Sequence, residues 1–299
     1  MFLEAAPPFN QATADVTFRS SDNVCFRLHK VILSLASPVF EGMFTIPRPA
    51  HGNDQPISVA EDSQTLDKLF RILYPIPDPP LETSAEVGAV LAAALKYDMD
   101  SAITVCKRAL LDPALLRKDP YGVYAVALDL DLEDELRTSL SHILHCPYDL
   151  PKGPSTALWT IPVTLQNWFV QYRADCKAAA IEAVSSYLQR AHGDRGAFHY
   201  ECAPCATYDG TSIGPMDFSL REDHYVAHST DILSATPCGA ALLEDKELGS
   251  TVFAVGENTA VCESCRQGLR EAMVEMQTRI AQEVDKAIAQ KSIRPPYST

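Results

Sequence analysis

The chain has 299 residues, and 46% of them are apolar, which suffices for a hydrophobic core and excludes disorder over the whole length. A net charge of −14 at pH 7 disfavours nucleic acid as the main partner, because phosphate binding needs clustered Lys and Arg, and it disfavours anionic membrane surfaces by repulsion. No apolar run approaches the ~18 residues of a transmembrane helix, and MFLEAAPPFNQATAD lacks the basic start and apolar stretch of a signal peptide. We therefore expect a cytoplasmic or nuclear location, where the nine cysteines are free thiols or metal ligands instead of disulfides.

The first part of the chain predicts a β-hairpin followed by two short helices. Residues 14–19 (ADVTFR) and 24–29 (VCFRLH) alternate apolar and polar side chains on either side of a polar turn, which is typical of a hairpin. The apolar stretch at 30–36 predicts a short helix. Ser37 and Pro38 then form a helix-start pair, with Ser37 as N-cap and Pro38 at the first helical position.

Helices are predicted for most of the remaining chain. After a short strand at 57–59, the apolar spacing and capping signals indicate further helices. They are expected to start with Ser63 as cap, at Thr83 (with Glu86 at capping-box spacing), at Ser101, at Asp119-Pro120 (a pair of helices dividing near 129–131), at Thr164 and at about 264. The predicted fold class is therefore α+β, with strands near the N-terminus and helices after them.

The order of these residues resembles the BTB (POZ) domain family over residues 12–112. That family begins with a hairpin of the form aDVtF…F.lHk, followed by vLs..SpvF..mF. Later, LFRILY at 69–74 is similar to the family's ll.yiY, and AAALKYDM at 92–99 is similar to its l..A.kYdm. The counterparts of the first two motifs occur in order at Asp15–Phe18, Phe26, Leu28–Lys30, Ile32–Leu33, Ser37–Phe40 and Met43–Phe44.

This resemblance implies a BTB fold of short strands and a helix cluster, and a non-enzymatic protein that binds other proteins or forms a homodimer through that domain. Residues 113–150 resemble the helical extension that often follows BTB domains. Residues 151–299 are predicted to be a mainly helical region with two CxxC pairs and a polar insert at 206–261. This C-terminal region resembles that of uncharacterised BTB proteins of mushroom-forming (basidiomycete) fungi.

Two other functions stay open for a BTB protein. One is a substrate adaptor of a cullin-based ubiquitin ligase, although the hydrophobic-x-Glu motif expected of such adaptors reads Ile46-Pro47-Arg48 here and lacks the Glu. The other is a transcriptional co-regulator, although the C2H2 zinc fingers that usually accompany that role are missing from the sequence. Neither alternative changes the expectation of protein partners without nucleic acid or membrane binding.

His29 lies where the strand pattern changes to a helix pattern. A histidine can act as a general base, a metal ligand or a pH-sensitive group. The resemblance places His29 and Asp15 in the structural signature of the family, so we interpret His29 as structural and paired with Asp15. Asp15 itself is expected to be a buried carboxylate with a cationic partner, because an unpaired buried charge is costly. We predict no catalytic residue.

The strongest chemical signal is the pair of motifs Cys202-Ala-Pro-Cys205 and Cys262-Glu-Ser-Cys265. Two CxxC turns can supply the four thiolates of a closed, structural zinc site. The long gap between the motifs weakens this prediction. A redox dithiol and inert packed cysteines remain as alternatives.

Three further signals are interpreted as structural. His224 and His228 have the i, i+4 spacing of a helical ligand pair but lie in a polar segment, which favours a solvated surface. The acidic run DLDLEDEL at 129–136 lacks the ligand order of a calcium loop and is expected to be a solvated face. No GxGxxG, GxxxxGK[ST] or GxSxG motif is found, so no organic cofactor is predicted.

Overall fold

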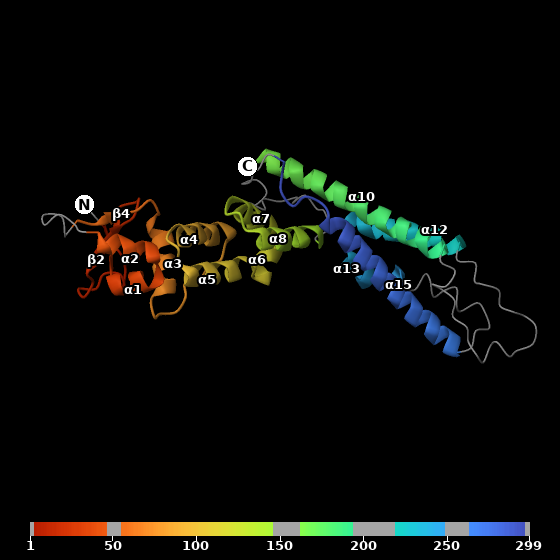
Figure 1. The fold of residues 1–299 in the computed structure, drawn as a ribbon, viewed down its shortest axis with the longest axis horizontal. Helices are drawn as coiled ribbons and strands as arrows, with labels where there is room; N and C mark the ends of the chain where they lie inside the picture. The colour runs from red at the N-terminus through yellow and green to blue at the C-terminus, as the bar shows by residue number, and fades with distance from the viewer. Residues whose placement is uncertain (1–2, 47–54, 146–161, 194–218, 249–262, 297–299) are drawn as a thin grey trace, which may run out of the picture. The chain divides into compact units, whose positions relative to one another are not determined.

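The computed structural model describes residues 3–46, 55–145, 162–193, 219–248 and 263–296 (Figure 1). The chain divides into two compact units, residues 1–140 and 141–299. Unit 1 contains a small sheet and helices, whereas the described part of unit 2 is helical. The α+β prediction, with strands only near the N-terminus, is confirmed for the described residues.

The sheet of unit 1 has the strand order β1-β3-β2-β4. Strands β2 (Val16–Arg19) and β3 (Val24–Leu28) form the predicted antiparallel hairpin, with Phe18 opposite Phe26. Strands β1 (Leu3–Glu4) and β4 (Ile57–Ser58) pair in parallel with β3 and β2. β1 has no counterpart among the predictions, because two residues are too few to show alternation.

The other regular elements described in unit 1 are helices, and α8 contains the boundary between the units. The predicted cap at Ser37 is confirmed, since its hydroxyl accepts the N–H of Phe40 at 3.0 Å. The short α6 was not predicted, because six residues show no clear apolar period. The helices are α1 (Lys30–Ala36), α2 (Pro38–Thr45), α3 (Ser63–Leu73), α4 (Ser84–Lys96), α5 (Asp100–Leu110), α6 (Pro113–Lys118), α7 (Pro120–Asp129) and α8 (Glu133–His145).

The core of unit 1 is built from aromatic rings around Phe70 on α3. The Phe70 ring meets those of Phe9, Phe18 and Phe26 edge-on, with centroids 5.7 to 6.0 Å apart. Phe18 in turn meets Phe40 of α2 at 5.2 Å. Since edge-on ring pairs stabilise beyond the area they bury, this cluster fixes α2 and α3 on the face of the hairpin.

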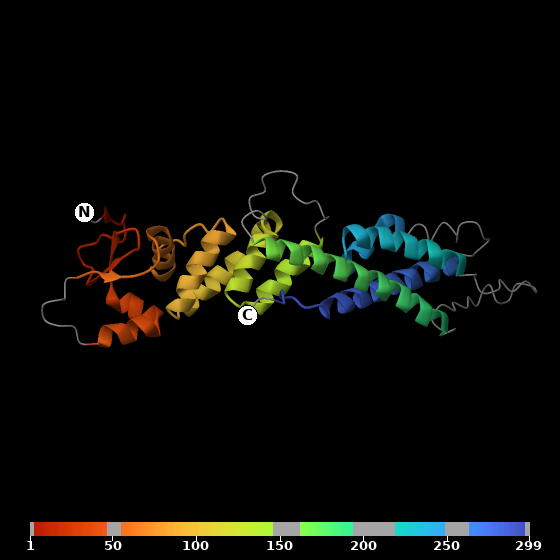
Figure 2. The same ribbon diagram turned by 90° about the horizontal axis from the view of Figure 1, so that it is seen from above.

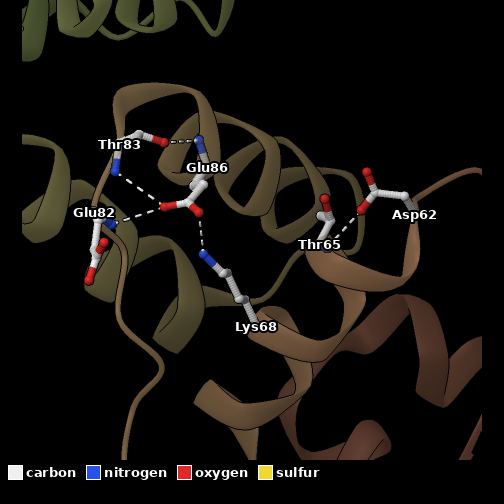
Figure 3. A network of polar contacts seen from close by, with 6 residues as sticks. All are labelled: Asp62, Thr65, Lys68, Glu82, Thr83 and Glu86. Atoms are coloured by element: carbon white, nitrogen blue, oxygen red, sulfur yellow. Dashed lines mark hydrogen bonds and ion pairs between the residues drawn. The ribbon is translucent and has the colours of Figure 1, made fainter. Parts of the chain in front are cut away.

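A polar network joins the starts of α3 and α4 (Figure 3). The capping box predicted for α4 is confirmed: the Thr83 hydroxyl accepts the Glu86 N–H at 3.2 Å, and the Glu86 carboxylate accepts the Thr83 N–H at 3.2 Å. The other oxygen of Glu86 pairs with Lys68 of α3 at 2.9 Å. The N-cap of α3 is Asp62, which accepts the N–H of Thr65, so the prediction of Ser63 as its cap is wrong by one residue.

Helix α7 packs closely on α4 because glycine lies at the contact. Asp119 caps α7 by accepting the Gly122 N–H at 2.9 Å, and its other oxygen accepts the hydroxyl of Ser84 on α4. A Cβ at Gly122 would overlap the Asp119 carboxylate and the Ser84 hydroxyl. The contact between the two helices therefore requires glycine at this position.

The described part of unit 2 contains two long helices and two shorter ones around an apolar core of residues such as Val184, Leu233 and Ile280. The segment predicted as a polar insert contains two of these helices, α12 and α13. Arg173, only 8% exposed, donates one hydrogen bond to the carbonyl of Ile143 at 2.8 Å and another to the carbonyl of Ala235. The helices are α10 (Val163–Gly193), α12 (Ser219–Ala235), α13 (Gly239–Glu244) and α15 (Glu263–Ala289).

The two long helices of unit 2, α10 and α15, run in opposite directions (Figure 1). The C-terminus of α10 and the N-termini of α12 and α15 lie at the same end in both views (Figures 1 and 2). An ion pair between Arg190 and Glu283 at 3.3 Å joins α10 to α15. Every helix among the described residues is too short or too polar to span a bilayer.

Replacing Gly122 by Ala is expected to lower the free energy of unfolding of unit 1 by about 1–3 kcal/mol, the usual cost of overpacking. The matched control is Gly42→Ala on α2, where a Cβ would meet nothing within 4 Å. That change is expected to be neutral or to stabilise by up to about 1 kcal/mol. Urea denaturation of the full chain measures both variants, and equal stability of the two would contradict the packing argument.

Glu86→Gln is expected to destabilise the chain by less than about 1 kcal/mol near neutral pH, because the ion pair with Lys68 is partly exposed. The hydrogen bond from Lys68 lowers the pKa of Glu86 below its usual 4.5, against the opposing effect of burial. The carboxylate therefore stabilises the fold above its unfolded pKa, and this contribution is lost as pH falls through the folded value.

The stability difference between wild type and Glu86→Gln should shrink as the pH is lowered below about 4. Glu82→Gln is the matched control, since Glu82 contributes only its backbone N–H to the network. A difference that stays constant from neutral to acid pH would show that the charge of Glu86 does not contribute.

Candidate protein-interaction surface

The outer sides of α1 and α2 expose apolar side chains, which we call the α1–α2 apolar surface: Val31, Leu35, Val39 and Ile46. Leu35 is 86% exposed, and Val31 and Ile46 are each about two-thirds exposed. Val31 and Leu35 are four residues apart and share one side of α1, whereas Val39 lies on α2 and Ile46 is the C-cap residue of α2. Clustered exposed apolar residues mark a binding surface, whereas scattered ones do not.

This surface is held rigidly from behind. Leu33 of α1 and Phe40 of α2 are fully buried. Phe40 stacks on Tyr97 with ring centroids 4.7 Å apart. Ser37, between the two helices, caps α2 and also donates its hydroxyl proton to the carbonyl of Tyr97 at 2.5 Å. Because the inner sides are fixed to the core, the outer sides of both helices must face solvent or a partner.

A hydrogen-bonded group fixes the start of α1. The Tyr74 hydroxyl, at the end of α3, lies 3.0 Å from the backbone nitrogen of His29 and 3.1 Å from its Nδ1. The other ring nitrogen of His29, Nε2, lies 3.1 Å from the hydroxyl of Thr13. Both ring nitrogens of His29 thus lie within hydrogen-bond distance of hydroxyl groups.

The predicted pairing of His29 with Asp15 is wrong. Asp15 is exposed, not buried, and its carboxylate accepts the backbone N–H of Lys30 at 2.7 Å. The ammonium group of Lys30 lies 5.9 Å from the centre of the Phe44 ring. Asp15 therefore acts at the first turn of α1, where a negative charge is favoured by the helix dipole.

The four predicted zinc ligands are not tested by the structure. Cys202, Cys205 and Cys262 lie outside the described residues, and Cys265 belongs to α15 but its side chain is not among those described. Among the described cysteines, Cys106, Cys176 and Cys238 are buried, and burial raises the pKa of Cys106 to about 12 and that of Cys176 to about 11. Within the described ranges, no group of His, Cys, Asp and Glu side chains is arranged to hold a metal ion.

The remaining sequence signals lie apart from the α1–α2 apolar surface. His224 on α12 is exposed, as predicted, whereas His228 is half-buried and its Nε2 lies 3.2 Å from Asp245. In the acidic run at 129–136, Glu135 is wrongly predicted as solvated: it is buried and lies 3.3 Å from Lys107. The helical period of α8 turns Glu135 to the inside.

Sequence reasoning missed the exposure of Val31 and Leu35. The stretch KVILSLA is apolar almost throughout, so its pattern cannot distinguish the buried side from the exposed side. The available signal was the length of the helix: a seven-residue helix at the surface buries only the side that faces the core, so a helix that is apolar on all sides must expose some of these residues.

Comparison with protein-family models matches the BTB/POZ domain at residues 7–113. No curated protein matches the chain, and the resemblance to basidiomycete proteins stays a prediction. The matched range covers strands β2, β3 and β4 and helices α1 to α5, including the α1–α2 apolar surface. The N-terminal part of this chain, residues 7–113, is therefore a BTB/POZ domain, a module for protein–protein interaction.

Proposed function

We propose that the chain is a non-enzymatic interaction protein that forms a homodimer through its α1–α2 apolar surface. The observation that carries this proposal is the concentration of exposed apolar residues. Of the ten large hydrophobic side chains that are exposed among the described residues, four lie within residues 31–46. They are contributed by two adjacent helices of a rigid module.

A second copy of the same surface is a suitable partner. Full burial of a Val, Leu or Ile side chain contributes about 1.5–3 kcal/mol, so four of them from each copy can offset the entropy lost on association. A two-fold dimer uses the same patch on both copies, and an apolar patch is complementary to itself. Such a dimer would present two copies of unit 2, which increases the avidity for any target of that unit.

Two alternatives compete with this proposal: a substrate adaptor of a cullin-based ubiquitin ligase and a transcriptional co-regulator. In both, the α1–α2 apolar surface or its neighbourhood would hold a different protein. At the position of the adaptor motif, Ile46 is exposed, while Pro47 and Arg48 lie outside the described residues. Nothing described favours either alternative over self-association.

Leu35→Glu is expected to convert the full-length dimer to a monomer, because it places a charge in the centre of the buried apolar surface. Light scattering after size-exclusion chromatography measures the mass. Val274→Glu on α15 is the matched control, an exposed apolar residue outside the BTB/POZ domain that should leave the dimer intact. A wild-type monomer at high concentration would overturn the proposal, and a monomeric wild type that captures a purified cullin would favour the adaptor.

We also propose that Cys202, Cys205, Cys262 and Cys265 bind one structural zinc ion. The support comes from the described helices. The segment with the first CxxC begins where α10 ends, and the second CxxC lies at the start of α15, at the same end of unit 2 (Figure 2). Four thiolates leave no open coordination position, so zinc would stabilise this end of the unit without catalysing a reaction.

Purified full-length protein is expected to contain about one zinc per chain, and Cys262→Ser/Cys265→Ser is expected to lose it. Elemental analysis by mass spectrometry measures the metal. Cys25→Ser in β3 is the control and should retain zinc. Metal-free wild-type protein with two reactive thiols would instead favour a redox dithiol, and metal-free protein with unreactive thiols would favour packed cysteines.

A further inference from the structure

A proline-rich segment, YPIPDPPLE at residues 74–82, connects α3 to α4 within the BTB/POZ domain. Residues 77–82 belong to neither a helix nor a strand. A connection between two helices does not by itself need so many prolines, so their arrangement calls for a separate explanation. The prolines are Pro75, Pro77, Pro79 and Pro80.

The residue order of this segment favours a polyproline II helix over residues 76–80. Each of these five residues either is a proline, whose ring fixes φ near −65°, or precedes a proline, which disfavours the α-helical conformation. The Ile76 N–H donates to the Tyr74 carbonyl at 2.7 Å, a tight turn that leads the chain away from α3. A polyproline II helix has three residues per turn and leaves its backbone open to solvent.

The exposure of the side chains follows the same three-residue period. Ile76 and Pro79, one turn apart, are both half-buried. Pro77 and Pro80, also one turn apart, are both exposed, and so is Asp78. One edge of the segment therefore packs on the domain, while a second edge presents two prolines at the spacing PxxP to solvent.

Both ends of the segment are held by packed helices. At one end, the Tyr74 N–H donates to the carbonyl of Phe70 on α3 at 3.1 Å. At the other end, the Glu86 carboxylate of α4 accepts the backbone N–H groups of Glu82 at 3.1 Å and Thr83 at 3.2 Å (Figure 3). A segment that is fixed in its bound conformation loses little entropy on binding, which favours affinity.

The charge of the segment is acidic. Asp78 and Glu82 are exposed, and the sequence has no Lys or Arg between Arg71 and Lys96. Arg71 is itself paired with a carboxylate of α3, that of Asp67, at 2.7 Å. A complementary partner therefore carries Lys or Arg at the rim of its binding groove.

We propose that residues 76–80 are a docking segment for a second protein that binds polyproline II helices in an aromatic-lined groove with a basic rim. Pro77 and Pro80 would pack on the aromatic rings, as in the recognition of PxxP segments by SH3, WW and EVH1 domains. This contact lies outside the α1–α2 apolar surface and does not depend on the proposed dimer. It gives the BTB/POZ domain a second class of protein partner.

The proposal is tested by titrating the full-length chain, at up to about 100 μM, onto an array of immobilised, purified SH3, WW and EVH1 domains. Biolayer interferometry measures the dissociation constants. We expect binding to a domain whose groove has a basic rim, and loss of that binding when an aromatic residue of the groove is replaced by Ala. Absence of binding to every domain, or binding that survives the groove substitution, would overturn the proposal.

Variants of this chain locate the contact. Pro77→Ala/Pro80→Ala should weaken binding at least about tenfold, while urea denaturation shows a folded chain, because both side chains are exposed. Pro162→Ala, an exposed proline just before α10, is the matched control and should bind as the wild type does. Equal affinity of the double variant and the wild type would show that another surface is bound.

Asp78→Asn tests the predicted charge of the partner. Removal of this exposed carboxylate should weaken binding about two- to fivefold at low salt, the usual range for a pair at a solvated rim. The difference from the wild type should shrink at high salt, because salt screens exposed charges. Tighter binding by Asp78→Asn would contradict the basic rim.

Discussion

The packing of the Phe70 ring is the interaction on which unit 1 depends. Through its edge-on contacts it joins the N-terminal segment, both strands of the hairpin and α3. The rings continue from Phe18 to Phe40 and from Phe40 to Tyr97, so the two helices α2 and α4 are attached to the same series of contacts. The orientation of α2, and with it the exposure of Val39, is a consequence of where its inward ring lies.

The sequence predicted those elements that local rules determine. The hairpin follows from the alternation of apolar and polar residues. The caps at Ser37, Thr83 and Asp119 follow from the preference of short polar side chains for helix starts. The predicted break lies near Asp131, which has a left-handed φ of 58°, a conformation that Asp adopts more readily than most residues. The elements without a prediction, β1, α6, α12 and α13, are short or have mixed polarity. Of these, β1 pairs with β3, α12 packs against α10, and α13 packs against α15.

The candidate surface was predictable only in part. The family resemblance pointed to the stretch around His29, but the partners of that residue depend on the tertiary fold: Tyr74 is 45 positions away along the chain. Asp15 shows the same limit. The family resemblance suggested that Asp15 is buried and paired with His29, whereas the folded chain uses its carboxylate on a backbone N–H at an exposed helix start. Spacing along the sequence shows which residues are neighbours on one element, but it does not show which residues of other elements their side chains contact.

The antiparallel pairing of α10 with α15 has a consequence for synthesis on the ribosome. Arg190 and Glu283 are 93 positions apart, and Arg173 reaches the carbonyl of Ala235 across 62 positions. Unit 1 is complete once residue 140 has emerged, whereas the apolar side of α10 is fully covered only when both α12 and α15 have followed. A nascent chain therefore carries a folded N-terminal module ahead of a helix whose apolar face is still unprotected, and this interval is the period in which a chaperone would be needed.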